Sequence, residues 1–316
     1  MDNNQELTNH PSLSVKEERL KKTKAFLQLM RPANIVTAVS DVLAGISISG
    51  ILFDRTLGPN EWWCIVLLCT STMGLYGGGV VLNDVFDAEL DKVERPERAI
   101  PRGDVEIIEA AGLGIVLLLI GIAASFLCNI YSGILACAIA VAAVVYDKWG
   151  KHRLILGPVN MGLCRGLNLL LGISIITSQL SHWWALAFIP IVYIASITMI
   201  SRGEVHGGSK NLLYAALFFY LLVIASILYF AVVNKNGIYF AIVFLLLFAW
   251  MIFNPLIKAI HEPIGKNIGK AVKAGVIGLI LMNASWASAF NAIYFAIIIT
   301  ILLPISIGLG KMFAVT

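Results

Sequence analysis

A chain of 316 residues that is 59% hydrophobic and only 13% charged, with a formal net charge of +4, is too apolar for a soluble globular protein. Its mean hydropathy of +0.85 predicts an all-α, multi-pass membrane protein. No nucleic-acid partner is expected.

The first 24 residues are polar and charged and contain no apolar segment of the kind that a cleaved signal peptide requires. We therefore expect residues 1–24 to form a polar cytoplasmic tail and residues 25–316 to form a single transmembrane domain. The first membrane helix then serves as a retained insertion signal.

Long apolar runs follow, and each is able to cross a hydrocarbon layer of roughly 30 Å. The connections at 128–131, 178–182 and 234–237 are short, so the runs that they join are expected to pack as antiparallel neighbours. Only the segment SWASAFNAIY separates the last two runs, which leaves nine or ten transmembrane helices as alternatives. In chain order the expected spans are 33–53, 63–86, 107–128, 131–147, 155–177, 183–201, 212–233, 237–258, 269–288 and 291–312.

The positions of lysine and arginine indicate an orientation. With the N-terminus in the cytoplasm, all 23 of these residues except Arg55, Lys235, Arg165 and Lys311 fall in the tail or in the loops after the even-numbered helices. The expected localisation is the cell (inner) membrane, with any active site on the cytoplasmic face.

The loop after the second span opens with an acidic cluster, NDVFDAELD. If the helix continues through residue 91, Asn83, Asp87 and Asp91 lie at i, i+4 and i+8 with Asp84 beside them, so all four share about a quarter of the helix circumference. Carboxylates this close repel one another unless cations lie between them, and hard oxygen ligands on one face suit Mg²⁺ and a bound phosphate. The pattern therefore favours a diphosphate site.

The alternative is a solvated, mixed-charge loop that only satisfies the positive-inside rule. The segment RPERAIPRG, which follows the acidic cluster, favours a fixed loop instead, because two prolines and a glycine restrict its backbone.

At these residues the chain resembles the UbiA superfamily of intramembrane prenyltransferases. NDVFDAELD matches the family's first motif, N-D-x-x-D-x-x-x-D, and RPERAIPRG matches R-P-x-R-P-I-P-x-G except for Ala99. MRPANIVTAVSDVLAG is similar to the family's first helix. Within the superfamily, YDKWGKHR, GPVNMGLCRGLNLLLG and SRGEVHGG are most similar to the EboC-type branch.

The resemblance implies a helix bundle around a central cavity, where Mg²⁺ holds an isoprenyl diphosphate whose prenyl group is transferred to a small aromatic acceptor. The implied partners are membrane lipid, this donor and this acceptor. The residues implied to hold the metal are Asn83, Asp84, Asp87, Asp91 and Glu204, of which the four carboxylates are also implied in catalysis. Residues implied to lie near the diphosphate are Arg95, Arg102, Tyr146 and Lys151.

The chain departs from the family at its second acidic motif, D-x-x-x-D, where SRGEVHGGSK has Glu204 as its only carboxylate. Arg202, His206 and Lys210 are then candidates for direct contact with the diphosphate. The alternative function is a catalytically degenerate protein that binds or transports a lipid or small metabolite. A secondary transporter fits less well, because transporter sites lie near the bilayer midplane.

Charged and amide side chains inside a membrane span are costly unless they face a cavity or a partner. Asp41, Arg165 and Asn34 either line a polar pocket for the acceptor or form buried ion pairs and interhelical hydrogen bonds. The five scattered cysteines are interpreted as small core hydrophobes rather than disulfide partners. The glycines at 74–79 are interpreted as sites of close helix packing.

Overall fold

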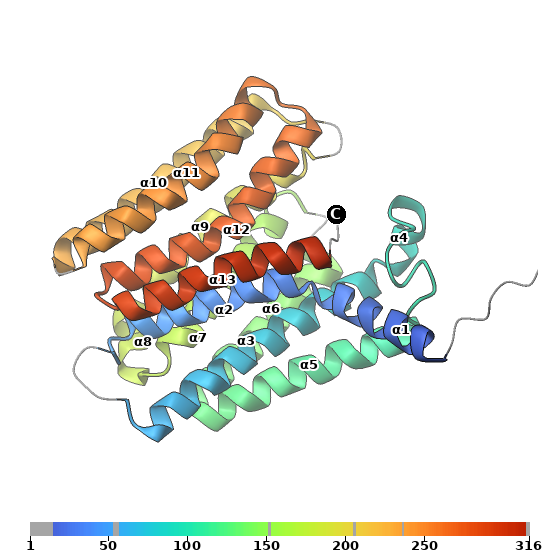
Figure 1. Cartoon of the computed structure of the whole chain (residues 1–316), viewed down its shortest axis with the longest axis horizontal. Helices are drawn as coiled ribbons and strands as arrows, with labels where there is room; N and C mark the ends of the chain where they lie inside the picture. The colour runs from blue at the N-terminus through green and yellow to red at the C-terminus, as the bar shows by residue number, and fades with distance from the viewer. Residues whose placement is uncertain (1–14, 53–56, 151–152, 205–206, 236, 314–316) are drawn as a thin grey trace, which may run out of the picture.

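The computed structural model describes residues 15–52, 57–150, 153–204, 207–235 and 237–313. These residues form helices and no strand, which confirms the all-α class (Figure 1). The elements are α1 (Val15–Met30), α2 (Pro32–Ile48), α3 (Pro59–Phe86), α4 (Ala88–Glu94), α5 (Ile107–Cys128), α6 (Ile130–Val145), the π-helix η1 (Tyr146–Gly150), α7 (Leu156–Ile173), α8 (Thr177–Trp183), the 3-10 helix η2 (Trp184–Ala187), α9 (Phe188–Ser201), α10 (Lys210–Asn234), α11 (Ile238–His261), α12 (Gly265–Ala289) and α13 (Ile293–Met312).

Each of the ten expected spans corresponds to a helix or a bent helix of this bundle. Among the described residues, eight helical spans are long and apolar enough to cross a membrane. The other two are α2, an apolar helix of 17 residues, and α7, whose 18 residues include Arg165 and two asparagines. The chain is a multi-pass membrane protein with both described ends on the same side of the bundle (Figure 1).

The sixth expected span, 183–201, differs in detail from the observed helices. The segment expected as a loop before it is α8, and the short helix η2 then leads into α9. Pro190, in the first turn of α9, has no N–H to donate to the carbonyl of Leu186. Regular α-helix therefore does not run through this segment without a break.

Glycines allow α3 and α5 to approach each other closely. A Cβ atom on Gly74 would lie 2.5 Å from the carbonyl oxygen of Leu117, and one on Gly78 would lie 2.7 Å from that of Gly114. Such distances leave no room for a side chain, so the interpretation of these two glycines as packing sites is confirmed.

The antiparallel α3 and α5 also bring two cysteines together at the end of the bundle remote from Asp87. Cys64, near the start of α3, and Cys128, the last residue of α5, form a disulfide with a Cα–Cα distance of 5.1 Å. The interpretation of all five cysteines as core hydrophobes is wrong for this pair. Sequence spacing alone does not reveal that two helices of similar length place these ends side by side.

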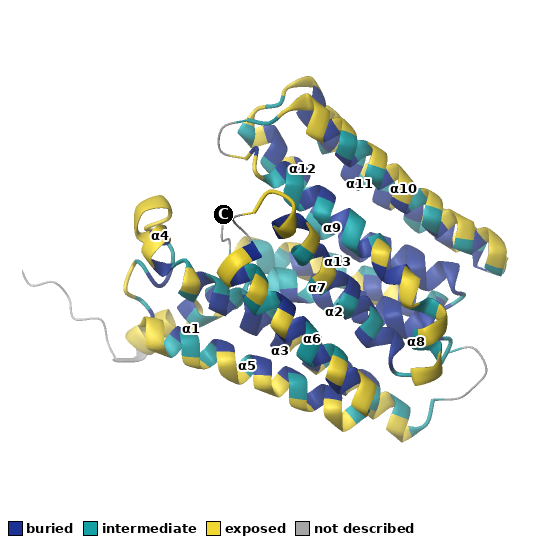
Figure 2. Cartoon of the chain, turned by 180° about the vertical axis from the view of Figure 1, so that it is seen from behind, coloured by how far each residue is buried: buried dark blue, intermediate teal, exposed yellow. Residues whose placement is uncertain are grey.

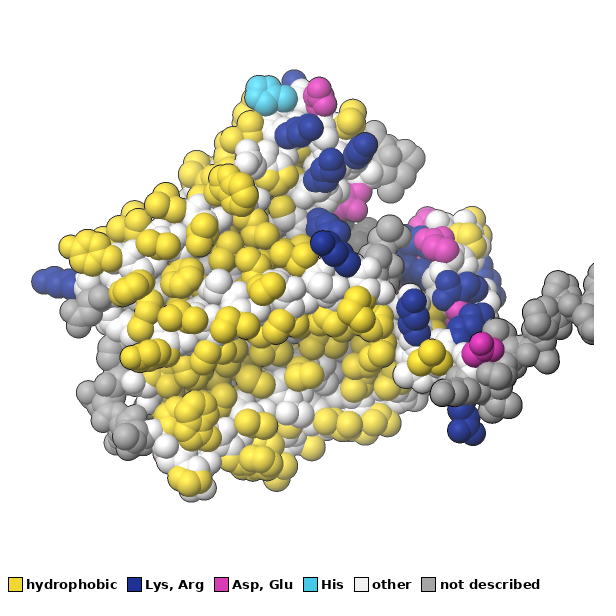
Figure 3. Space-filling view, in the orientation of Figure 1, with side chains coloured by type: hydrophobic (Ala, Val, Ile, Leu, Met, Phe, Trp, Pro, Cys, Tyr) yellow, Lys and Arg dark blue, Asp and Glu magenta, His cyan; other side chains and the backbone are white. Residues whose placement is uncertain are grey.

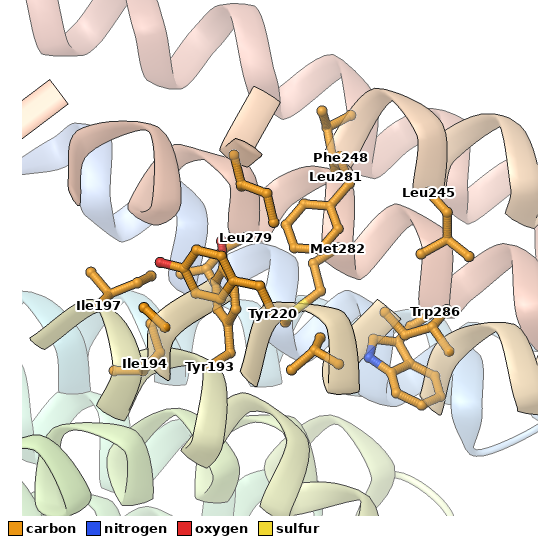
Figure 4. Packing of buried hydrophobic residues seen from close by; sticks show 14 of the residues in the cluster. Tyr193, Ile194, Ile197, Tyr220, Leu245, Phe248, Leu279, Leu281, Met282 and Trp286 are labelled. Carbon is orange, nitrogen blue, oxygen red and sulfur yellow. The ribbon is translucent and has the colours of Figure 1, made fainter. Parts of the chain in front are cut away.

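The helices α9 to α12 share a core of large buried side chains (Figure 4). The ring of Tyr193 lies 5.0 Å from that of Tyr220 and 5.6 Å from that of Phe248, between ring centroids. The hydroxyl of Tyr193 donates to the carbonyl of Gly275 at 2.8 Å. This core supports Ile194 and Ile197, which face the interior cavity described below.

The outer surface divides into an apolar belt and one charged end. Exposed residues cover the outer sides of α5, α10 and α11 (Figure 2), and these include many large hydrophobic side chains. Lysine, arginine and acidic side chains gather beside α1 and α4 and over the turn between α11 and α12 (Figure 3). This distribution is that of a protein whose middle faces lipid.

Helix α1 crosses the expected boundary at residue 24 and is held against the charged end. Its residues Ala25 and Leu29 are buried in a small core with α3 and the segment after α4. Lys21 pairs with Asp104 at 2.9 Å and Lys22 pairs with Glu109 at 2.5 Å.

Candidate functional site

A cavity of about 350 Å³ lies inside the bundle, bounded by α2, α3, α6, η1, α7, α9 and α12 and closed at one end by the segment after α4. Its residues on α3 repeat every three or four positions, which marks one face of a helix. These residues are Thr72, Leu75, Tyr76, Gly79, Val80 and Asn83, and Asp87 follows them directly after the helix. At 1.5 Å per residue, the cavity extends about 22 Å along α3.

The cavity wall has a charged end and a largely apolar remainder. The lining residues at the charged end are Arg31, Asn83, Asp87, Arg95, Arg98, Tyr146 and Asp147. The apolar lining consists of Leu75, Val80, Ile139, Ala143, Met161, Cys164, Ile194, Ile197 and Val276. Such a wall suits a ligand with an anionic head and a hydrocarbon tail.

The helix that carries the acidic cluster is interrupted at Asp87, which caps α3 before α4 takes a different direction (Figure 1). Asp87 and Asn83 line the cavity, whereas Asp84 and Asp91 are buried beside arginine side chains. The acidic cluster therefore does not lie on one continuous helix. Asn83 and Asp87 line the cavity, Asp84 and Asp91 pair with arginines, and a metal-binding role for all four stays a prediction.

Arg31 and Arg98 are the arginines that hold Asp84 and Asp91. Nη2 of Arg31 donates to Oδ1 of Asp84 at 2.7 Å, and Nη1 of Arg98 donates to Asp84 at 3.2 Å and to Asp91 at 2.6 Å. The Nε atoms of both arginines are buried without a hydrogen-bond partner among the described residues. Both side chains line the cavity, so each has donor capacity left for an anionic ligand.

Arg31 reaches this position from an unusual backbone. It lies between α1 and α2 with φ 50° and ψ 64°, in the left-handed region that non-glycine residues rarely occupy. Strain of this kind persists where surrounding contacts hold the residue, and it is common at binding sites. The ion pair with Asp84 is one such contact.

Asp147 is the second carboxylate of the cavity wall, across from α3. It is only 3% exposed, lies in η1 next to Tyr146, and its Oδ1 accepts a hydrogen bond of 2.8 Å from Nδ2 of Asn83. Since the amide nitrogen of Asn83 is directed at Asp147, its oxygen is left to accept from, or coordinate, another group.

The oxygen donors at the charged end fit one Mg²⁺ bound together with a phosphate. Among the described residues, no three His, Cys, Asp or Glu side chains are grouped so that they could hold a metal ion. Asp87, Asp147 and Asn83 provide two carboxylates and an amide oxygen, and Mg²⁺ commonly takes one or two carboxylates and completes its shell with water and phosphate oxygens. Asp84 and Asp91 face arginines in this structure, and their expected part in holding the metal stays a prediction.

The remaining residues implied for the diphosphate end divide between the cavity and the surface. Arg95, Tyr146 and Asn34 line the cavity. Arg102 does not, because its side chain pairs with Asp104 and donates to the carbonyl of Glu97 at 3.3 Å. Lys151 lies outside the described residues.

The segment after α9 is not part of the cavity wall in the region that the structure describes. Glu204 does not line the cavity, and partial burial raises its pKa against the opposing charge of Arg95. Arg202 donates to the carbonyl of Arg153 at 2.7 Å, and Lys210 is exposed at the start of α10. His206 lies outside the described residues.

Asp41 and Arg165 form a buried ion pair with a 2.8 Å contact between Oδ2 and Nη1. Asp41 also accepts from Asn168 and from Asn283, so both of its oxygens are engaged, and it does not line the cavity. Arg165 and Asn168 do line it, at a distance along the helices from the charged end. Asp41 therefore has a structural role, whereas Arg165 combines that role with a place in the wall.

Three further lining residues carry chemistry that the sequence did not single out: Arg31, Arg98 and Asp147. Arg31 was visible only as part of the motif MRPAN, and Arg98 as one of several arginines in RPERAIPRG. Asp147 lies beside Tyr146 in YDKWGKHR, so its neighbour in that motif was the available signal.

Fold and cavity together define a class: a polytopic α-helical membrane protein with an internal cavity that is charged at one end and apolar along its length. The chain belongs to the UbiA prenyltransferase family, whose profile matches residues 43–262.

Two relatives are archaeal proteins named digeranylgeranylglyceryl phosphate synthase. That of Saccharolobus solfataricus is 32% identical over 178 residues, which cover 56% of this chain and 60% of the relative. That of Sulfurisphaera tokodaii is 29% identical over 202 residues, which cover 60% of this chain and 68% of the relative. The match thus spans less than two thirds of the length of the first of these relatives.

Solved structures of the family share the fold. A UbiA homologue from Aeropyrum pernix K1 is 15% identical with a TM-score of 0.62, over 79% of this chain and 96% of that one. A homologue from Archaeoglobus fulgidus, in a complex with DMAPP and Mg²⁺, is also 15% identical with a TM-score of 0.62, over 85% and 99%. At this identity the likeness establishes the architecture.

Proposed function

We propose that the protein is an intramembrane prenyltransferase that takes an isoprenyl diphosphate as donor. The observation that carries this proposal is that one cavity has a charged end and a largely apolar remainder. The charged end contains the arginines Arg31, Arg95 and Arg98 together with Asn83 and Asp87. Guanidinium groups bind phosphate oxygens through charge-assisted hydrogen bonds, and the apolar wall accommodates the prenyl chain. The DMAPP and Mg²⁺ complex of the Archaeoglobus fulgidus homologue supports the donor class and the metal.

In the proposed reaction the allylic carbon–oxygen bond of the donor breaks and both electrons leave with pyrophosphate. The acceptor atom then forms a bond to the allylic carbon and loses its proton. The arginines stabilise the charge that develops on the leaving group, and two of them, Arg31 and Arg98, are already oriented by Asp84 and Asp91 before the donor binds. Asn83 and Asp87 would hold Mg²⁺, which would supply further positive charge to stabilise the leaving group.

The acceptor class is proposed from the relatives. Their name is that of an enzyme whose product is a glyceryl phosphate carrying two geranylgeranyl groups. We propose a polar-headed acceptor of this glyceryl phosphate type, which would take precedence over the small aromatic acceptor expected from sequence. The same names favour a branch near these synthases over the EboC-type branch.

The charged end of the cavity is proposed to open at the cytoplasmic face of the cell membrane. The distribution of lysine and arginine supports this orientation. The Cys64–Cys128 disulfide supports it independently, because the bond lies at the opposite end of α3 and disulfides persist on the oxidising side of a membrane.

The rival function is a degenerate protein that binds or transports a lipid or small metabolite without turnover. The observation in its favour is that no described residue of the 202–210 segment lines the cavity, so the family's second acidic wall is missing there. Both functions require a diphosphate or polar lipid in the cavity, but only the transferase releases pyrophosphate.

The test uses the purified full-length protein with Mg²⁺, geranylgeranyl diphosphate, and either a geranylgeranylglyceryl phosphate or an aromatic acceptor. We expect pyrophosphate and a prenylated product, with a preference for the glyceryl phosphate, and we expect Asp87→Ala to abolish both. Binding of the donor without any Asp87-dependent pyrophosphate release, whichever acceptor is supplied, would contradict the transferase and favour the binding protein.

A further inference from the structure

The cavity has an acidic wall at the end of α3, but the described residues of the segment that would supply the opposing acidic wall do not line it. The only carboxylate of that segment, Glu204, is only partly buried, and it is absent from the lining. A diphosphate bound only from the α3 side would have its other oxygens facing arginine and apolar groups. The chemistry of the site therefore raises the question of which group lies opposite Asp87.

Asp147 is the other carboxylate that lines the cavity. It follows α6, so it approaches the cavity from a different helix than Asp87, and its carboxylate is joined to the α3 wall through the 2.8 Å hydrogen bond with Asn83. Its side chain is as deeply buried as those of Asp84 and Asp91. Burying a carboxylate is costly, so a role that uses its charge is favoured over a purely packing role.

Asp147 lies in the π-helical turn η1, where it lines the cavity together with its neighbour Tyr146. A π-turn at the end of an α-helix places an additional residue on one side, and such turns occur frequently at functional sites.

A second observation points to an anionic ligand between these walls. The side chain of Arg98 is 9% exposed, lines the same cavity, and has an Nε–H that is buried without a partner among the described residues. A buried donor that lacks a protein acceptor is unfavourable unless a ligand supplies the acceptor. Phosphate oxygens bound between Asn83, Asp147 and Arg98 would do so.

We propose that Asp147 is the second acidic group of the site and that, with Asn83 and Asp87, it holds the Mg²⁺–diphosphate head of the donor in place of the degenerate second motif. This inference deepens the proposed function and depends on it. Asp147 contributes from η1 what the family's second motif would contribute from the segment after α9, and Glu204 has no part in binding the head.

The first test compares Mg²⁺-dependent binding of geranylgeranyl diphosphate to the full-length protein in lipid nanodiscs, by calorimetry, for the wild type and two matched variants. Asp147→Asn keeps an oxygen that accepts from Asn83 but removes the charge, and we expect the affinity to fall roughly tenfold or more, with a higher Mg²⁺ requirement. Asp147→Glu restores the charge and is expected to recover part of the affinity. Glu204→Gln is expected to stay within about twofold of the wild type.

The outcomes separate the inference from the proposed function. If the wild type does not bind the diphosphate in a Mg²⁺-dependent manner, the proposed function fails. If the wild type binds but Asp147→Asn binds equally well, the function stands and the inference is wrong. A loss of binding in Glu204→Gln alone would show that the second acidic group is Glu204, in the segment after α9, and not Asp147.

A second measurement needs no variant, so it is informative even if Asp147→Asn does not fold. Fe²⁺ replaces Mg²⁺ in the wild-type protein with bound geranylgeranyl diphosphate, and peroxide is added so that radicals cut the backbone next to the ion. We expect cuts near residue 87 and near residue 147. Cuts near residues 87 and 204, with none near 147, would overturn the proposal.

Discussion

Arg165 of α7 and Asp41 of α2 form an ion pair inside the membrane bundle, with side chains that are only 5% and 1% exposed. The pair does not stand alone, because Nη2 of Arg165 donates to Thr37 at 2.9 Å and Nδ2 of Asn283 donates to Asp41 at 2.8 Å. Three helices, α2, α7 and α12, are thus joined by one polar network beside the cavity.

Removing one member of this pair should destabilise the protein strongly. Arg165→Met leaves the carboxylate of Asp41 buried without its counter-charge, and breaking a buried pair in this way costs about 3–5 kcal/mol. The double variant Asp41→Leu/Arg165→Met leaves no charge and should be more stable than Arg165→Met alone. Unfolding midpoints in detergent measure both.

Lys258→Met, at an exposed position near the end of α11, is the matched control and should change the midpoint little. A double variant that is less stable than Arg165→Met would show that the network, rather than the unpaired charge, dominates.

Arg98 and Arg102 belong to the same loop but should differ in their effect on donor binding. Arg98 lines the cavity and holds Asp84 and Asp91, whereas Arg102 pairs with Asp104 at the surface. Hydrogen bonds to charged groups contribute about 1.5–3 kcal/mol, so Arg98→Gln should weaken diphosphate binding by roughly ten- to a hundredfold.

Arg102→Gln is the control for this loop and should stay within about twofold, measured by the same titration. Equal losses in both variants would mean that the loop adopts a different conformation when the donor is bound.

Sequence patterns were sufficient to predict the helices and the shared position of Asn83 and Asp87, two of the four residues of the acidic cluster. Apolar runs of membrane length and a four-residue spacing are local properties, so the helices and the shared cavity face of Asn83 and Asp87 followed from them. The pairing of Asp84 with Arg31 depends on a left-handed residue between two helices, which a linear motif does not encode.

The loop after α4 and the turn η1 are further places where a linear motif does not show which side chains face the cavity. The choice between Arg98 and Arg102 depends on how successive turns fold, and the inward position of Asp147 depends on a π-turn whose register no periodicity indicates. In both cases the residues lie within the motifs RPERAIPRG and YDKWGKHR. What the sequence lacked was the direction in which each side chain points.

Gly78 should be intolerant of even a methyl group, whereas Gly112 should accept one. A Cβ on Gly78 would lie 2.7 Å from the carbonyl oxygen of Gly114 in the neighbouring helix, while one on Gly112 would meet no atom within 4 Å. Overpacking costs about 1–3 kcal/mol, so Gly78→Ala should lower the unfolding midpoint and Gly112→Ala should not. A similar midpoint for the two variants would mean that α3 and α5 separate without cost.

Asp104 should hold the start of α1 in a pH-dependent manner. Burial opposes the charged form, but the hydrogen bonds from Lys21 and Arg102 outweigh it and lower the pKa of Asp104 below its ordinary value of 3.8. A carboxyl with a lowered pKa stabilises the folded state at any pH above its unfolded value, and this contribution is lost as the pH falls through the folded pKa. Attachment of α1 should therefore be unchanged between pH 7 and 5.

Spin labels at the exposed positions Leu20 and Ile108 report this attachment through their distance distribution. We expect a single narrow distance at pH 7 that broadens only below pH 3.8. Asp104→Asn should give the broad distribution already at pH 7, because the neutral side chain keeps its size but loses the ion pairs with Lys21 and Arg102. Glu89→Gln, which removes an exposed pair with Lys92, should leave the distance narrow. A narrow distance for Asp104→Asn would mean that Ala25 and Leu29 hold α1 without help from the ion pairs.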